Sequence, residues 1–291
     1  MARLRPTMQE RVVQFGPERG LVGILTLPAT AVVAPHVVLL NSGVIHRVGS
    51  NRIYVELARA LATAGITVLR FDLSGIGDSR RRTDVSSVRE SVERDIADAI
   101  EYLASTRGSD QVVLMGLCSG AFDALTSAIN QPRVIGAFMV DIPGPFQGWR
   151  HTLRHIAARL FRQASWRNPL RSLVGHSRKL VTADARNGSS NGRYVVGARG
   201  TASRARMQDQ LDALLARGVR LHFTFTAGLE ENYNHPSQFR STFPRAARHQ
   251  SLSYDFFEER DHSFSTRDMR DRLVHRAVAW VLGGQLQRKA S

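Results

Sequence analysis

The sequence contains a single cysteine and has no long apolar run. One cysteine cannot form an internal disulfide or a cysteine-rich metal site. No stretch of about 18 apolar residues is present, so we expect no membrane-spanning helix. The first residues lead into charged sequence without the apolar core of a signal peptide. Together these absences predict a cytosolic protein.

Acidic residues are scarce in one segment of the chain. Residues 144–206 carry 13 of the 40 lysines and arginines but only one of the 25 acidic residues, Asp184, so most of the net charge of +15 lies there. No nucleic-acid motif or basic stripe with interleaved aromatic residues accompanies this charge, so we predict no nucleic-acid partner. Two interpretations remain: recognition of an anionic substrate or carrier, such as CoA or an acyl carrier protein, or an arginine-rich face that is merely solvated.

The length of 291 residues fits one α/β domain with an insertion. Apolar runs alternate with amphipathic helical patterns, which is typical of a mostly parallel central sheet flanked by helices. We expect strands within residues 10–28, where two flank a turn, and at 36–40, 66–71, 111–115, 134–140, 219–226 and 251–257. Helices are expected at 52–64, 87–105, 119–129 and 267–282. The rhythm breaks at 142–205, which predicts an inserted basic lid on a core made of 1–141 and 206–291.

The sequence Gly-Leu-Cys-Ser-Gly at 116–120 lies between an expected strand and an expected helix. A nucleophile held at such a tight corner needs small residues two positions before and after it, and Gly116 and Gly120 satisfy this for Cys118. Ser119 is a poorer nucleophile candidate because Leu117 and Ala121 flank it, but its backbone N–H would start the helix and could stabilise an oxyanion. The alternative is that Cys118 is a small buried apolar residue.

These motifs resemble the α/β-hydrolase superfamily. The cysteine-centred corner is similar to that of dienelactone hydrolases and polyhydroxyalkanoate synthases. The overall spacing is closer to small bacterial hydrolases and thioesterases, including exosortase-associated hydrolases. The resemblance covers about 36–141 and 219–285 and implies an α/β-hydrolase fold with a helical lid insertion. Most relatives carry serine where this chain has Cys118, and this difference favours acyl transfer through a thioester over ester hydrolysis.

The resemblance also implies the remaining site residues. The second oxyanion N–H would come from Val44, with Gly43 shaping the loop, and the run Asp72–Ser79 matches a structural loop beside the site. The general base would be His262, which follows the last strand. The acid would follow the strand at 219–226, where Glu230 and Glu231 are both available, and the Gly-Leu-Glu run favours Glu230. Asp261 is too close in sequence to His262 to orient it.

The sequence therefore predicts a hydrolase or acyltransferase that acts on a small-molecule ester or thioester through an acyl-cysteine. The mechanism requires neither a metal nor an organic cofactor. Two alternatives stay open: an inactive α/β-hydrolase scaffold that binds a ligand, and a membrane-surface module that uses the basic amphipathic stretch 149–162. The second is disfavoured because an apolar stripe in a lid is expected to cover the pocket.

Overall fold

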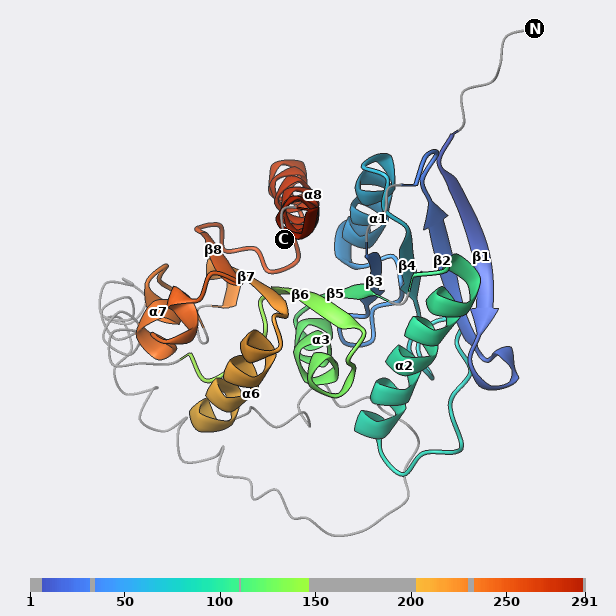
Figure 1. Cartoon of the computed structure of the whole chain (residues 1–291), viewed down its shortest axis with the longest axis horizontal. Helices are drawn as coiled ribbons and strands as arrows, with labels where there is room; N and C mark the ends of the chain where they lie inside the picture. The colour runs from blue at the N-terminus through green and yellow to red at the C-terminus, as the bar shows by residue number, and fades with distance from the viewer. Residues whose placement is uncertain (1–6, 32–34, 110, 147–202, 230–232, 290–291) are drawn as a thin grey trace, which may run out of the picture.

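A computed structural model describes residues 7–31, 35–109, 111–146, 203–229 and 233–289. Its centre is an eight-stranded sheet with the order β1-β2-β4-β3-β5-β6-β7-β8 (Figure 1). Strand β2 runs antiparallel to both of its neighbours, and the pairs from β4 to β8 are parallel. The strands are β1 (Gln9–Phe15), β2 (Leu21–Leu27), β3 (His36–Leu40), β4 (Val68–Phe71), β5 (Val112–Leu117), β6 (Val134–Val140), β7 (Arg220–Thr226) and β8 (Leu252–Phe257).

Helices cover both faces of this sheet (Figure 1). They are α1 (Ile53–Thr63), α2 (Val88–Arg107), α3 (Ser119–Asn130), α6 (Arg204–Ala216), α7 (Gln238–Thr242) and α8 (Arg267–Lys289). Helices α1 and α8 lie on one face, and α2, α3 and α6 lie on the other. Because both faces are covered, the central strands β3 and β5 are buried throughout, which explains their continuous apolar sequence.

Alternate residues of β3 serve the two halves of the core. Val37 and Leu39 belong to the apolar cluster formed with α1 and α8. Val38 and Leu40 belong to the cluster formed with α2, α3 and α6. This is the period of two expected for a strand, so β3 contributes to the packing on both faces of the sheet.

The observed order of strands and covering helices is that of the α/β-hydrolase fold, as predicted. Two helices were not predicted. Helix α6 was missed because its start was assigned to the lid, although Met207, Leu211, Leu214 and Leu215 form one buried face. The short helix α7 was also missed, and α8 extends to Lys289 rather than ending at residue 282.

Most of the predicted lid, 142–205, lies outside the described residues, as does the stretch 149–162. Its first residues belong to the core: Ile142 and Phe146 are buried. Phe146 packs against aromatic rings of β7 and of the segment that includes α7, namely Phe225, Tyr233, Phe239 and Phe243. Among the helices of the described ranges, none is long and apolar enough to cross a bilayer.

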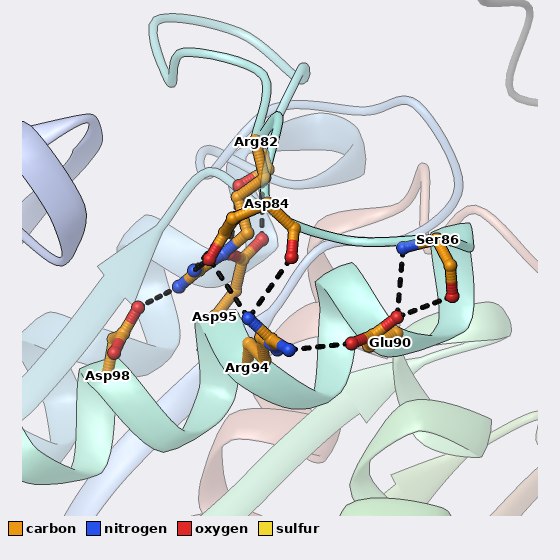
Figure 2. Close-up of polar contacts among 8 residues, drawn as sticks. Arg82, Asp84, Ser86, Glu90, Arg94, Asp95 and Asp98 are labelled. Atoms are coloured by element: carbon orange, nitrogen blue, oxygen red, sulfur yellow. Dashed lines mark hydrogen bonds and ion pairs between the residues drawn. The ribbon is translucent and has the colours of Figure 1, made fainter.

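A charged network fastens the segment after β4 to helix α2 (Figure 2). Arg82 is nearly buried and its Nε donates to Asp95 at 2.6 Å, while its guanidinium also pairs with Asp98. Asp95 is fully buried and also accepts from the backbone N–H and hydroxyl of Ser74, at 2.7 and 2.8 Å. Arg94 makes the more exposed pairs of the network, with Asp84 and Glu90.

We expect Arg82→Met to lower the free energy of unfolding by about 3 kcal/mol, because it leaves the buried Asp95 carboxylate without its cation. Arg94→Met is the matched control, and it should cost no more than about 1 kcal/mol because its pairs are solvated. Urea unfolding monitored by circular dichroism measures both. Equal losses for the two variants would contradict the importance assigned to the Arg82 pair.

Candidate active site

Cys118 sits at the sharp corner between β5 and α3. Its backbone has φ 54° and ψ −115°, an unusual conformation for a residue other than glycine. A Cβ placed on Gly116 would lie 2.2 Å from the Gly120 carbonyl carbon, and one on Gly120 would lie 2.5 Å from the Asn41 carbonyl oxygen. Both positions therefore require glycine. Cys118 is partly exposed, so it is not sealed in the core.

His262 comes from the segment between β8 and α8 and is directed to the same corner. Its Nδ1 lies 2.8 Å from Oδ2 of Asp141. Burial alone would lower the pKa of His262, but hydrogen bonds and charge interactions with Asp141 and Cys118 outweigh it and raise the pKa to about 10. The imidazole is therefore protonated at neutral pH, and a neighbouring imidazolium stabilises a thiolate.

Asp141 is the carboxylate behind His262. It directly follows β6, has φ 49°, and its side chain is almost completely buried. The backbone N–H and the hydroxyl of Thr226 at the end of β7 each donate to it at 2.7 Å. The carboxylate is thus held by three hydrogen bonds, counting His262, which fixes its orientation and stabilises its charge.

The carboxylate that contacts His262 is not one of the two predicted acids. Glu230 and Glu231, predicted for that place after β7, lie outside the described residues, and the carboxylate that contacts His262 is Asp141, one strand earlier. Parallel strands β6 and β7 end at the same edge of the sheet, so either strand end can supply a carboxylate there. The signal in the sequence is an aspartate immediately after the apolar strand 134–140, at the predicted boundary between the core and the lid.

Asp261 does not contact the ring of its neighbour. Its carboxylate accepts from the backbone N–H and hydroxyl groups of Ser263 and Ser265. Its slight burial would raise the pKa of Asp261, but these hydrogen bonds lower it well below its usual range. Asp261 therefore shapes the turn that carries His262, in agreement with the prediction that it does not orient the imidazole.

The loop after β3 approaches the corner from the other side. A turn from Ser42 to Ile45 is closed by the Ile45 N–H donating to the Ser42 carbonyl at 3.0 Å, and Gly43 within it has φ 59°. The Gly43 N–H donates to Oγ of Ser119 at 2.6 Å. Within the described ranges, the N–H groups of Val44 and Ser119 have no acceptor, so both amides that we predicted for an oxyanion hole are available as donors.

The run Asp72–Ser79 anchors this loop. Asp72 is fully buried and accepts from the backbone N–H of Arg47 at 2.6 Å and from its guanidinium. The Asn41 side chain donates to the Ile45 carbonyl and accepts from the Leu73 N–H, both at 2.8 Å. A Cβ on Gly77 would lie 2.3 Å from the Asp72 carboxylate. These contacts match the structural role expected for the run. Across the described residues, no group of three or more His, Cys, Asp or Glu side chains is placed to hold a metal ion.

Comparison with known proteins supports the fold. The family model of serine aminopeptidase S33 matches residues 34–263. The chain belongs to this family. It is therefore a member of the α/β-hydrolase superfamily, although Cys118 stands at the place where serine is expected in a family named for serine hydrolases. No curated protein matches the chain.

Solved structures share the fold at low sequence identity. The Pyrococcus furiosus esterase PF2001 is 13% identical with a TM-score of 0.58, and the alignment covers 94% of this chain and 92% of the esterase. An esterase domain from Rhodothermus marinus is 21% identical with a TM-score of 0.55, covering 94% and 97%. A Xanthomonas campestris α/β serine hydrolase without a lid is 15% identical with a TM-score of 0.53, covering 94% and 95%.

Proposed function

We propose that this hydrolase cleaves an ester or thioester, or transfers its acyl group, through a covalent acyl-cysteine at Cys118. The observation that carries the proposal is the partly exposed Cys118 on a strained corner, with His262 beside it and Asp141 hydrogen-bonded to the far side of the imidazole. Nucleophile, base and orienting acid in this order are the arrangement that activates a nucleophile for acyl transfer.

In the first half-reaction, the Cys118 thiolate attacks the substrate carbonyl and forms a C–S bond. The N–H groups of Val44 and Ser119 donate to the oxygen on which negative charge develops. When the tetrahedral intermediate collapses, the bond to the leaving alcohol or thiol breaks, and protonated His262 gives its proton to that group. The product is an acyl-cysteine and a neutral imidazole.

In the second half-reaction, the neutral imidazole of His262 takes a proton from water, or from an acceptor alcohol or amine, as that group attacks the thioester carbonyl. The C–S bond then breaks, which releases the acid, ester or amide and restores the thiolate and imidazolium. Asp141 keeps the Nδ1–H of His262 directed toward itself, so Nε2 is the nitrogen that exchanges protons with Cys118 and the acyl acceptor.

The substrate class follows from the nucleophile and the charge of the chain. Esterases among the structural neighbours support an ester, and a cysteine nucleophile also suits exchange with thioesters. The basic segment 144–206 supports an anionic acyl donor, such as a CoA thioester or an acyl carrier protein. A reactive thiol persists in a reducing compartment, so we place the reaction in the cytoplasm.

The test is intact-protein mass spectrometry after incubation with an activated ester, p-nitrophenyl acetate, and with acetyl-CoA. We expect the mass to increase by one acetyl group, located on the peptide that contains Cys118, and to return to that of the free enzyme as the adduct turns over. Cys118 is the only cysteine, so Cys118→Ala is a direct control for the site. Absence of any adduct, with unimpaired ester turnover in the alanine variant, would exclude the acyl-cysteine.

A further inference from the structure

Ser119 joins two segments that are far apart in sequence. Its Oγ accepts a hydrogen bond of 2.6 Å from the N–H of Gly43, 76 residues earlier in the chain. Ser119 begins α3 immediately after Cys118, and it is only 8% exposed. The hydroxyl therefore connects the loop after β3 to the corner that carries the thiol, at a place largely protected from competing water.

The hydrogen bond between the Gly43 N–H and Ser119 Oγ restrains the turn of the loop at Gly43. Gly43 is the first central residue of a two-residue turn, and glycine at this position permits several orientations of the following peptide. Once the Gly43 N–H is held by Ser119, that amide cannot serve an oxyanion itself. The next amide, that of Val44, is then the one left to face a substrate.

Other contacts hold the loop at its two ends but not at Gly43. The buried hydroxyl of Tyr54 donates to the Leu40 carbonyl at 2.7 Å and accepts from the Leu117 N–H at 2.9 Å, which joins β3 to β5 below the loop. The contacts of Asp72 and the Asn41 side chain restrain residues 41, 45 and 47. Ser119 is thus the residue whose side chain restrains the turn against the corner itself.

We propose that the Ser119 hydroxyl is a positioning residue for the oxyanion hole, holding Gly43 so that the Val44 N–H is directed toward the substrate oxygen. This rests on the proposed acyl transfer at Cys118. Ser119 then acts in two ways: its backbone N–H donates to the oxyanion directly, and its Oγ aligns the second donor. Replacing Ser119 with alanine removes only the second contribution, because the backbone N–H remains.

Two reagents separate this role from a general structural one. Acylation of Cys118 by p-nitrophenyl acetate passes through an oxyanion and uses the hole, whereas alkylation by iodoacetamide displaces iodide and forms no oxyanion. For Ser119→Ala we expect the acylation rate constant to fall about 10- to 100-fold, somewhat less than for complete loss of an oxyanion donor. The rate of alkylation by iodoacetamide should be unchanged, and KM for p-nitrophenyl acetate should change little. Ser119→Thr, which keeps the hydroxyl, should restore the acylation rate.

Ser127→Ala is the matched control, because Ser127 lies on the same helix and its buried hydroxyl has no hydrogen-bond partner among the described residues. It should leave both rates at the wild-type value. Acylation as fast in Ser119→Ala as in the wild type would overturn the positioning role, and so would a parallel loss of acylation and alkylation. Wild-type protein that is alkylated but never acylated would instead refute the proposed function on which this role depends.

Discussion

Replacing Cys118 with alanine should abolish turnover almost completely, with kcat/KM for a simple ester reduced on the order of 10⁴-fold or more. Without the sulfur atom, no covalent intermediate can form. The oxyanion donors and His262 remain, so a small residual rate above that of uncatalysed hydrolysis is expected. The measurement is the initial rate of p-nitrophenol release at several ester concentrations.

Cys118→Ser is the informative companion variant because it installs the nucleophile that the family name implies. A serine hydroxyl must lose its proton to a neutral base, whereas Asp141, which remains in this variant, raises the pKa of His262 and favours its protonated form. We therefore expect the serine variant to react more slowly than the wild type but faster than the alanine variant, and to resist iodoacetamide. An alanine variant with the wild-type rate would show that turnover occurs elsewhere on the molecule.

The parts of the site that the sequence predicted are those built from local sequence. Small residues at 116 and 120 are demanded by the backbone geometry of a single turn, and they bracket Cys118 in five consecutive positions. His262 lies shortly after the last strand, β8, which ends at Phe257, within a turn shaped by its neighbours. Such short-range requirements leave a pattern that can be interpreted without coordinates.

The contact between Asp141 and His262 could not be predicted from the sequence because it depends on long-range packing. Asp141 is 121 residues from His262 in sequence, and its role is visible only when β6 and β7 are paired so that Thr226 can hold it. The hydrogen bond between Gly43 and Ser119 could not be predicted from the sequence for the same reason. In both cases, the contact joins segments that are far apart in the sequence, and no periodicity or spacing encodes it.

Asp141→Asn should lower kcat/KM on the order of 10³- to 10⁴-fold, because an amide at that place neither carries charge nor reliably fixes the imidazole tautomer. Asp261→Asn is the matched control: it changes the other carboxylate next to His262, the one that bonds Ser263 and Ser265 rather than the ring, and should change kcat/KM far less. If both variants kept nearly the wild-type kcat/KM, the acid would have to be sought at Glu230 or Glu231.

Asp141→Asn should also change how the stability of the folded protein depends on pH. In the folded protein the pKa of His262 is raised from 6.5 to about 10, so the folded state binds the proton more tightly than the unfolded chain does. This stabilisation is complete below about pH 6.5 and is lost as pH rises through about 10. In Asp141→Asn the largest favourable contribution is gone, so we expect a flatter decline of Tm between pH 7 and 10 than in the wild type. Parallel Tm profiles for the two proteins would mean that Asp141 does not hold the imidazolium, and the acyl transfer mechanism would then need a different partner for His262.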